Sequence, residues 1–118
     1  MAKITAIVND LIFMTKIRNT AEYFGLSVAF VGSEQQVDHY VKDCELILID
    51  LENDFVDSLS LIERLKKNPE TSSIKLIGYM SHVNTPLRAH ALASGCDGVL
   101  SRFEFNSSVR EILQAACC

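Results

Sequence analysis

A chain of 118 residues, 48% of them hydrophobic and with only two prolines and five glycines, is long enough to form one domain around a buried core. Its net charge of −4, with no basic run longer than Lys66-Lys67, argues against nucleic-acid binding. No stretch approaches the roughly 18 apolar residues of a membrane span, and the first residues lack a signal-peptide pattern, so we expect a cytoplasmic protein without membrane contact.

The first half of the chain alternates between predicted strands and helices. Residues 4–8 form a short apolar run, which is typical of a strand buried on both faces. The amphipathic stretch at 10–24 predicts a helix that Gly25 ends. A second apolar run at 26–31 precedes a helix that begins at the capping residue Ser33.

The second half repeats this alternation. The third strand, 46–49, leads directly into Asp50, and a polar loop connects it to a helix that ends at 68–69, an Asn-Pro pair. A fourth strand is predicted at 74–79, followed by a helix that begins at the Thr-Pro pair 85–86.

The last strand is predicted at 98–101. We expect the last helix to be capped by Asn106, Ser107 or Ser108, the last of which forms a potential capping box with Glu111.

Five strands alternating with five helices predict an α/β fold with a parallel sheet and right-handed crossovers. The expected architecture is flavodoxin-like, a three-layer αβα arrangement of (βα)5 type with strand order 2-1-3-4-5. We expect residues 1–118 to form this single domain, whether it stands alone or belongs to a longer chain.

Carboxylates follow the two strands that adjoin the switch point of this topology. Asn9 and Asp10 close the first strand and Asp50 closes the third, and open α/β folds bind ligands in the crevice between such strand ends. Asp50 could serve there as a phosphoryl acceptor, as a metal ligand or as a solvated strand end. A pair of carboxylates offers the hard oxygen ligands that Mg²⁺ prefers.

Four segments, at residues 7–10, 48–50, 64–69 and 91–101, occur in an order and spacing that resemble the receiver domain of bacterial response regulators over essentially the full length of the chain. This resemblance implies a response regulator of a two-component or phosphorelay system, in which a histidine kinase transfers phosphate to the acceptor aspartate at position 50.

The resemblance also implies Mg²⁺ as the cofactor. Its ligands would be Asp10, Asp50 and the backbone carbonyl of Glu52. Asn9 stands in place of an acid and could contribute its oxygen directly or through water.

Several positions depart from the family pattern. The hydroxyl that ends the fourth strand in the family falls on Met80 or Ser81, depending on register. Arg102 replaces the usual lysine, and its larger planar group is not a conservative replacement at a tight phosphate site. Phe103 replaces the proline that follows, and 53–54 is Asn-Asp where the family has Met-Pro.

These departures favour an atypical receiver domain that has weak or no phosphorylation and acts by protein–protein docking. The alternative is a competent, Mg²⁺-dependent phosphoreceiver that accepts phosphate at Asp50. Neither hypothesis makes the chain an enzyme beyond gain and loss of that phosphate. The expected partner is a signalling protein or a histidine kinase.

In receiver domains the common docking surface is formed by the fourth helix, the fifth strand and the fifth helix. Phe103, Phe105 and Val99 border this surface, so we expect them to contact a partner. The alternative for either ring is a hydrophobic staple at the start of the last helix.

Four remaining features concern packing. Cys44 and Cys96 are predicted to be small core residues. Cys117-Cys118 is predicted to be a frayed end of the last helix, with a lipidation signal as the alternative. His82 is expected in a solvated loop after the fourth strand, and Gly78 is expected to allow a neighbouring side chain to pack closely.

Overall fold

Five parallel strands form one sheet in the order β2-β1-β3-β4-β5 in the computed structural model, which describes residues 3–81 and 85–116. The elements in chain order are β1 (Lys3–Ile7), α1 (Leu11–Phe24), β2 (Ser27–Phe30), α2 (Glu34–Tyr40), β3 (Leu46–Asp50), α3 (Ser58–Lys67), β4 (Lys75–Met80), α4 (Thr85–Ser94), β5 (Gly98–Ser101) and α5 (Arg102–Ala116). The predicted fold class and strand order are confirmed.

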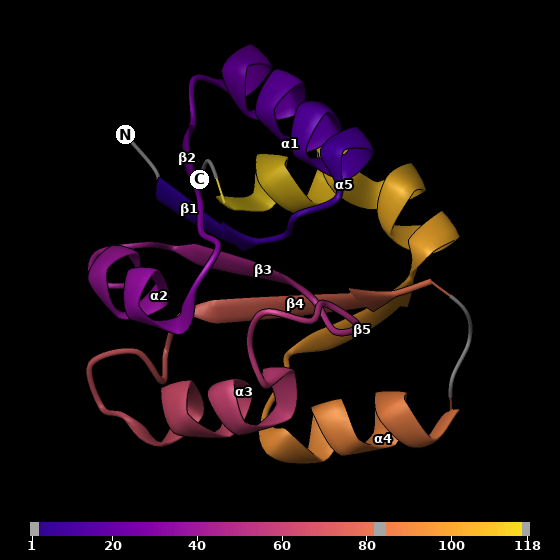
Figure 1. Cartoon of the computed structure of the whole chain (residues 1–118). Coiled ribbons are helices and arrows are strands. Elements are labelled where there is room, and N and C mark those ends of the chain that lie inside the picture. Colours follow the sequence, from indigo (N-terminus) through magenta and orange to yellow (C-terminus); the bar gives the residue numbers. More distant parts are fainter. Residues whose placement is uncertain (1–2, 82–84, 117–118) are drawn as a thin grey trace.

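Helices cover both faces of the sheet, and each face has its own core. Figure 1 shows α1 and α5 on one side of the sheet and α2, α3 and α4 on the other. The core under α1 and α5 includes Phe13, Tyr79 and Phe105. The core on the other face includes Ile62 and Met80. Because both faces are covered, the central strands are buried on both sides, which explains their continuous apolar sequences.

The start of α5 differs from the prediction. The helix begins at Arg102, directly after β5, and not at a cap within 106–108. The reason is a capping box formed by Ser101 and Glu104, seven residues before the potential box at Ser108 and Glu111. Ser101 Oγ accepts the Glu104 N–H at 3.1 Å, while Glu104 Oε1 accepts the Ser101 N–H at 2.8 Å. The box therefore fixes the backbone of Arg102, the first residue of the helix.

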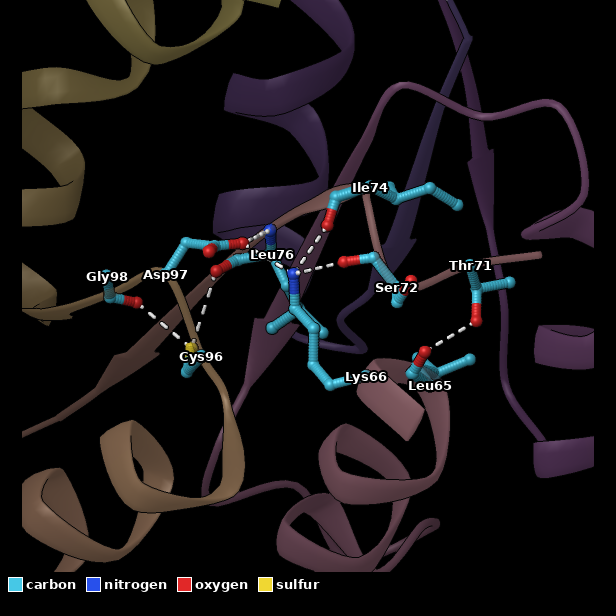
Figure 2. A network of polar contacts seen from close by, with 9 residues as sticks. All are labelled: Leu65, Lys66, Thr71, Ser72, Ile74, Leu76, Cys96, Asp97 and Gly98. Atoms are coloured by element: carbon cyan, nitrogen blue, oxygen red, sulfur yellow. Dashed lines mark hydrogen bonds and ion pairs between the residues drawn. The ribbon is translucent and has the colours of Figure 1, made fainter. Parts of the chain in front are cut away.

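A polar network connects the segments at the amino-terminal ends of β4 and β5, as Figure 2 shows. Lys66 Nζ, near the end of α3, donates to the carbonyl oxygens of Ser72 and Ile74 at 3.3 and 2.8 Å and to Asp97 Oδ2 at 2.7 Å. The same carboxylate oxygen accepts the N–H of Leu76 at 2.8 Å. One ammonium group thus joins α3, the loop before β4, and the turn between α4 and β5.

The packing expectations are confirmed where the structure describes them. Cys44 and Cys96 are buried. A Cβ at Gly78 would lie 3.0 Å from Leu51 Cγ, so this glycine allows the close approach that was predicted. His82 and Cys117-Cys118 lie outside the described residues. Among the helices of residues 3–81 and 85–116, none is long and apolar enough to cross a membrane.

Candidate functional site

Asp10 and Asp50 meet at the carboxyl edge of the sheet, as the topology predicted. Asp50 is the last residue of β3, and Asp10 immediately precedes α1. β1 and β3 are neighbours, with Ile7 opposite Ile49, so the chain segments that follow the two strands emerge together. Burial raises the pKa of Asp50, and the negative charge of nearby Asp10 adds to this rise. The candidate site is therefore the region at these two strand ends, which adjoins a hollow lined by Ser81 and Arg102 and is called the cleft below.

Asp10 has both carboxylate oxygens engaged. Its Oδ1 caps α1 by accepting the N–H groups of Ile12 at 2.9 Å and Phe13 at 3.3 Å. Its Oδ2 accepts a hydrogen bond from the guanidinium of Arg102, which also forms an ion pair with it. Partial burial raises the pKa of Asp10, but the hydrogen bonds from Arg102 and from the Phe13 N–H outweigh burial and hold the pKa below its ordinary value. Asp10 is thus a paired, ionised carboxylate.

Arg102 points into the cleft and is held there from two sides. The capping box fixes its backbone at the first position of α5. Its guanidinium carbon lies 4.6 Å from the centroid of the Phe13 ring, within the range of a cation–π contact. The arginine at the position where receiver domains have a lysine therefore pairs with Asp10, which follows the first strand, and lies against an aromatic ring.

Asp50 is half-buried beside this pair. Its Oδ1 accepts the N–H of Glu52 at 2.9 Å, and its backbone oxygen accepts the side-chain amide of Asn53 at 2.7 Å. Burial raises the pKa of Asp50, and the Glu52 N–H and Arg102 lower it only in part, so the pKa lies above its ordinary value. Within the described part of the chain, Asp50 Oδ2 has no hydrogen-bond partner, which leaves one oxygen directed to a ligand or to solvent.

We expect Asp50→Asn to raise the free energy of unfolding at neutral pH, by about 0.5–1 kcal/mol. A carboxyl whose pKa rises on folding costs stability when it is ionised. This cost is absent below its unfolded pKa, near 3.8, and reaches its full size above the folded pKa. Asparagine cannot ionise and keeps an oxygen for the Glu52 N–H.

Urea unfolding at pH 7 and again below pH 3.8 measures this effect, because the gain should vanish in acid. Asp54→Asn removes the same charge from an exposed position in the following loop and is the matched control. Equal stability of Asp50→Asn and the unchanged protein at pH 7 would contradict the prediction.

The register of β4 separates the two candidates for the family's hydroxyl position. Asp50 pairs with Tyr79, so the next residue, Met80, faces the other side of the sheet. Met80 is fully buried in the core there and offers no hydroxyl. Ser81 is exposed, and both its N–H and its Oγ donate to the carboxylate of Glu52. The serine hydroxyl is thus already paired with an acid.

Tyr79 lies buried next to Asp50, and sequence reasoning missed it. Its ring stacks on Phe105, with centroids 4.6 Å apart, and its hydroxyl is buried without a hydrogen-bond partner among the described residues. Burial raises the pKa of this hydroxyl, and the charges of Asp50 and Asp10 raise it further. The available signal was a tyrosine within the predicted fourth strand, and the register of that strand places it opposite Asp50.

The structure corrects two of the three predicted docking residues. Phe105 is fully buried between the sheet and α1, and Val99 is buried on the opposite face, so neither side chain is available to a partner. Phe103 is 80% exposed. The reason is the early start of α5, because in the resulting helix Phe105 faces the core and Phe103 faces solvent.

While Arg102 is bound to Asp10, one carboxylate oxygen of the predicted Mg²⁺ ligands is engaged. The described residues contain no group of three or more His, Cys, Asp or Glu side chains arranged to hold one. Asp10 has its two oxygens engaged by helix α1 and by Arg102, and Asn9 is exposed. Asp50 and the carbonyl of Glu52 are the other oxygen donors of the predicted set, and a Mg²⁺ ion held by them would keep several of its waters.

No protein-family model and no curated protein matches the sequence. Solved structures do. The receiver domain of a sensor histidine kinase from Pseudomonas aeruginosa PAO1, with a magnesium ion in its active site cleft, is 17% identical and has a TM-score of 0.80 over 98% of this chain and 97% of that chain.

Two further structures are similar over 99% of this chain. An orphan response regulator of H. pylori is 16% identical, with a TM-score of 0.77 and 97% of that chain covered. A response regulator from Thermotoga maritima is 18% identical, with a TM-score of 0.79 and 98% of that chain covered. The chain therefore has the fold of response-regulator receiver domains over nearly its whole length.

Proposed function

We propose that this chain is a receiver domain of a two-component or phosphorelay system that signals by docking to a protein partner, with weak or no phosphorylation at Asp50. The observation that carries the proposal is the pairing of the groups around Asp50 with one another. Asp10 is bound by Arg102, and Ser81 is bound by Glu52. A phosphoryl group on Asp50 would compete with these carboxylates for Arg102 and for the Ser81 hydroxyl.

The surface beside the cleft supports docking. Leu11 and Ile12 at the start of α1 are each 74% exposed, and Phe103 at the start of α5 is 80% exposed. Ile12 and Phe103 line one hollow of about 450 Å³, together with Phe13, Ser81, Arg102 and Asn106. Large exposed apolar side chains around a hollow are typical of a protein-binding surface. A partner held there would lie directly over Arg102 and the acidic cleft.

The test is incubation with Mg²⁺ and acetyl phosphate, followed by the mass of the intact protein. We expect only a small minority of molecules to gain one phosphate. A receiver domain that accepts phosphate from acetyl phosphate, treated in parallel, shows that the donor is active, and Asp50→Asn shows which signal depends on the acceptor. Phosphate on most molecules of the unchanged protein, and on none of Asp50→Asn, would overturn the proposal.

The second candidate function is a competent phosphoreceiver, and one observation favours it. Asp50 keeps an oxygen without a partner in the described part of the chain, and Arg102 is close enough to lower its pKa. The guanidinium of Arg102 could therefore stabilise a phosphoryl group on Asp50. Under this candidate the partner is a histidine kinase, and the acetyl phosphate experiment decides between the two functions.

A further inference from the structure

The cleft contains its own cation. Three acidic residues, Asp10, Asp50 and Glu52, lie at one end of the sheet, and the guanidinium of Arg102 is bound directly to the first of them. Close carboxylates in a partly buried cleft repel one another unless a positive charge lies between or beside them. In this chain an arginine side chain provides that charge.

Both carboxylate oxygens of Asp10 already accept hydrogen bonds. One oxygen is used by the N–H groups of the first turn of α1, and the other is used by Arg102. A metal ion at the second oxygen would place another positive charge against the guanidinium, and the first oxygen is required as the helix cap. Binding of a divalent ion and pairing with Arg102 therefore compete at Asp10.

The position of Arg102 is determined by more than one contact. The capping box between Ser101 and Glu104 sets its backbone, and the Phe13 ring supports its guanidinium at 4.6 Å. Glu104 is in turn within ion-pair distance of Arg88 on α4, at 3.3 Å. A single exposed ion pair contributes little to stability, but a cation already restrained on an aromatic face loses less entropy on pairing.

We propose that Arg102 takes the place of a divalent cation in this cleft, so that the acidic site is charge-balanced without metal and a metal ion binds only by displacing the guanidinium from Asp10. The inference deepens the proposed function. It rests on that proposal in one respect, which is that this cleft is the signalling site. Its consequence is a docking surface whose shape and charge do not depend on the supply of Mg²⁺.

The experiment measures the affinity of the purified protein for Mn²⁺ and for Mg²⁺ alone, by calorimetry and by the electron paramagnetic resonance of free Mn²⁺. The variant is Arg102→Met, which removes the charge and keeps a long apolar side chain. Its matched control is Arg110→Met. Arg110 lies on the same helix and stacks on an aromatic ring, with its guanidinium carbon 4.8 Å from the Tyr23 centroid. Both variants change the net charge by the same amount.

We expect Arg102→Met to bind Mn²⁺ at least about tenfold more tightly than the unchanged protein, which corresponds to about 1.4 kcal/mol. Arg110→Met should bind like the unchanged protein. The double variant Asp10→Asn with Arg102→Met should lose the gain while keeping the helix cap, because asparagine caps a helix as well as aspartate does. Arg102→Gln is measured in parallel, so that the comparison survives if the methionine variant fails to fold.

Equal metal affinity of the unchanged protein and the folded Arg102 variants would overturn the inference, and so would an equal gain in Arg110→Met. Neither result bears on docking or phosphorylation, because the measurement contains no phosphodonor and no partner. Conversely, full phosphorylation by acetyl phosphate would overturn the proposed function while leaving the competition between metal and Arg102 to be read from these titrations.

Discussion

Phe105→Ala is expected to lower the free energy of unfolding by about 3–5 kcal/mol. Phe105 is 0% exposed, stacks on Tyr79 with an interplanar angle of 16°, and meets the edge of Phe13 with centroids 5.5 Å apart. Removing the ring would leave a cavity between α5 and the sheet and would expose two other aromatic faces to it. Urea unfolding followed by far-ultraviolet circular dichroism measures the loss.

Phe103→Ala is the matched control, two residues away on the same helix. Its ring is 80% exposed, so we expect a change within about 0.5 kcal/mol. The two variants compare a surface ring with a core ring, although the sequence analysis predicted both rings to contact a partner. Similar losses in both variants would mean that α5 does not begin at Arg102, and the orientation of the arginine in the cleft would then be wrong as well.

Most of the fold could be predicted because its signals are local and agree with one another. Leu46 to Ile49 are apolar on both faces, which only a strand covered on both sides permits, and Gly25 adopts the left-handed conformation (φ 70°) that ends α1 as expected. The start of α5 was predicted wrongly because the sequence contains two possible capping boxes. Ser101 with Glu104 and Ser108 with Glu111 have the same spacing, and only the packing of Phe105 against the sheet selects the first.

The candidate site was predictable only in part, for a related reason. Topology brings the ends of β1 and β3 together, so the meeting of Asp10 with Asp50 follows from strand order. The pairing of side chains does not follow from strand order. It depends on the direction in which α5 leaves β5, which places Arg102 on Phe13 and against Asp10. Sequence spacing contains no information about that direction once the start of the helix is misplaced.

The second large expected effect is a loss of stability when the Lys66 network at the amino-terminal ends of β4 and β5 is removed. Lys66→Met should lower the free energy of unfolding by about 2–3 kcal/mol at neutral pH. The substitution leaves two backbone carbonyl oxygens, of Ser72 and Ile74, without the ammonium that binds them and removes the ion pair of Asp97 (Figure 2). Only 15% of the Lys66 side chain is exposed, so water replaces these contacts incompletely.

Lys67→Met is the matched control, because Lys67 forms an exposed pair with Glu63 one turn away on the same helix. Such pairs contribute about 0.5 kcal/mol or less. A loss in Lys67→Met as large as that in Lys66→Met would show that the effect comes from helix α3 as a whole and would contradict the role given to the network.

Acid should reduce the difference between Lys66→Met and the unchanged protein. Burial raises the pKa of Asp97, but the Lys66 ammonium and the Leu76 N–H outweigh it and hold the pKa below its ordinary value of 3.8. A carboxyl with a lowered folded pKa contributes its stability in full above the unfolded pKa and loses it as the pH falls through the folded value. The difference between the two proteins should therefore narrow as the pH falls below 3.8, by the part that Asp97 contributes, and an unchanged difference in urea unfolding there would assign the loss to the carbonyl contacts of Lys66 alone.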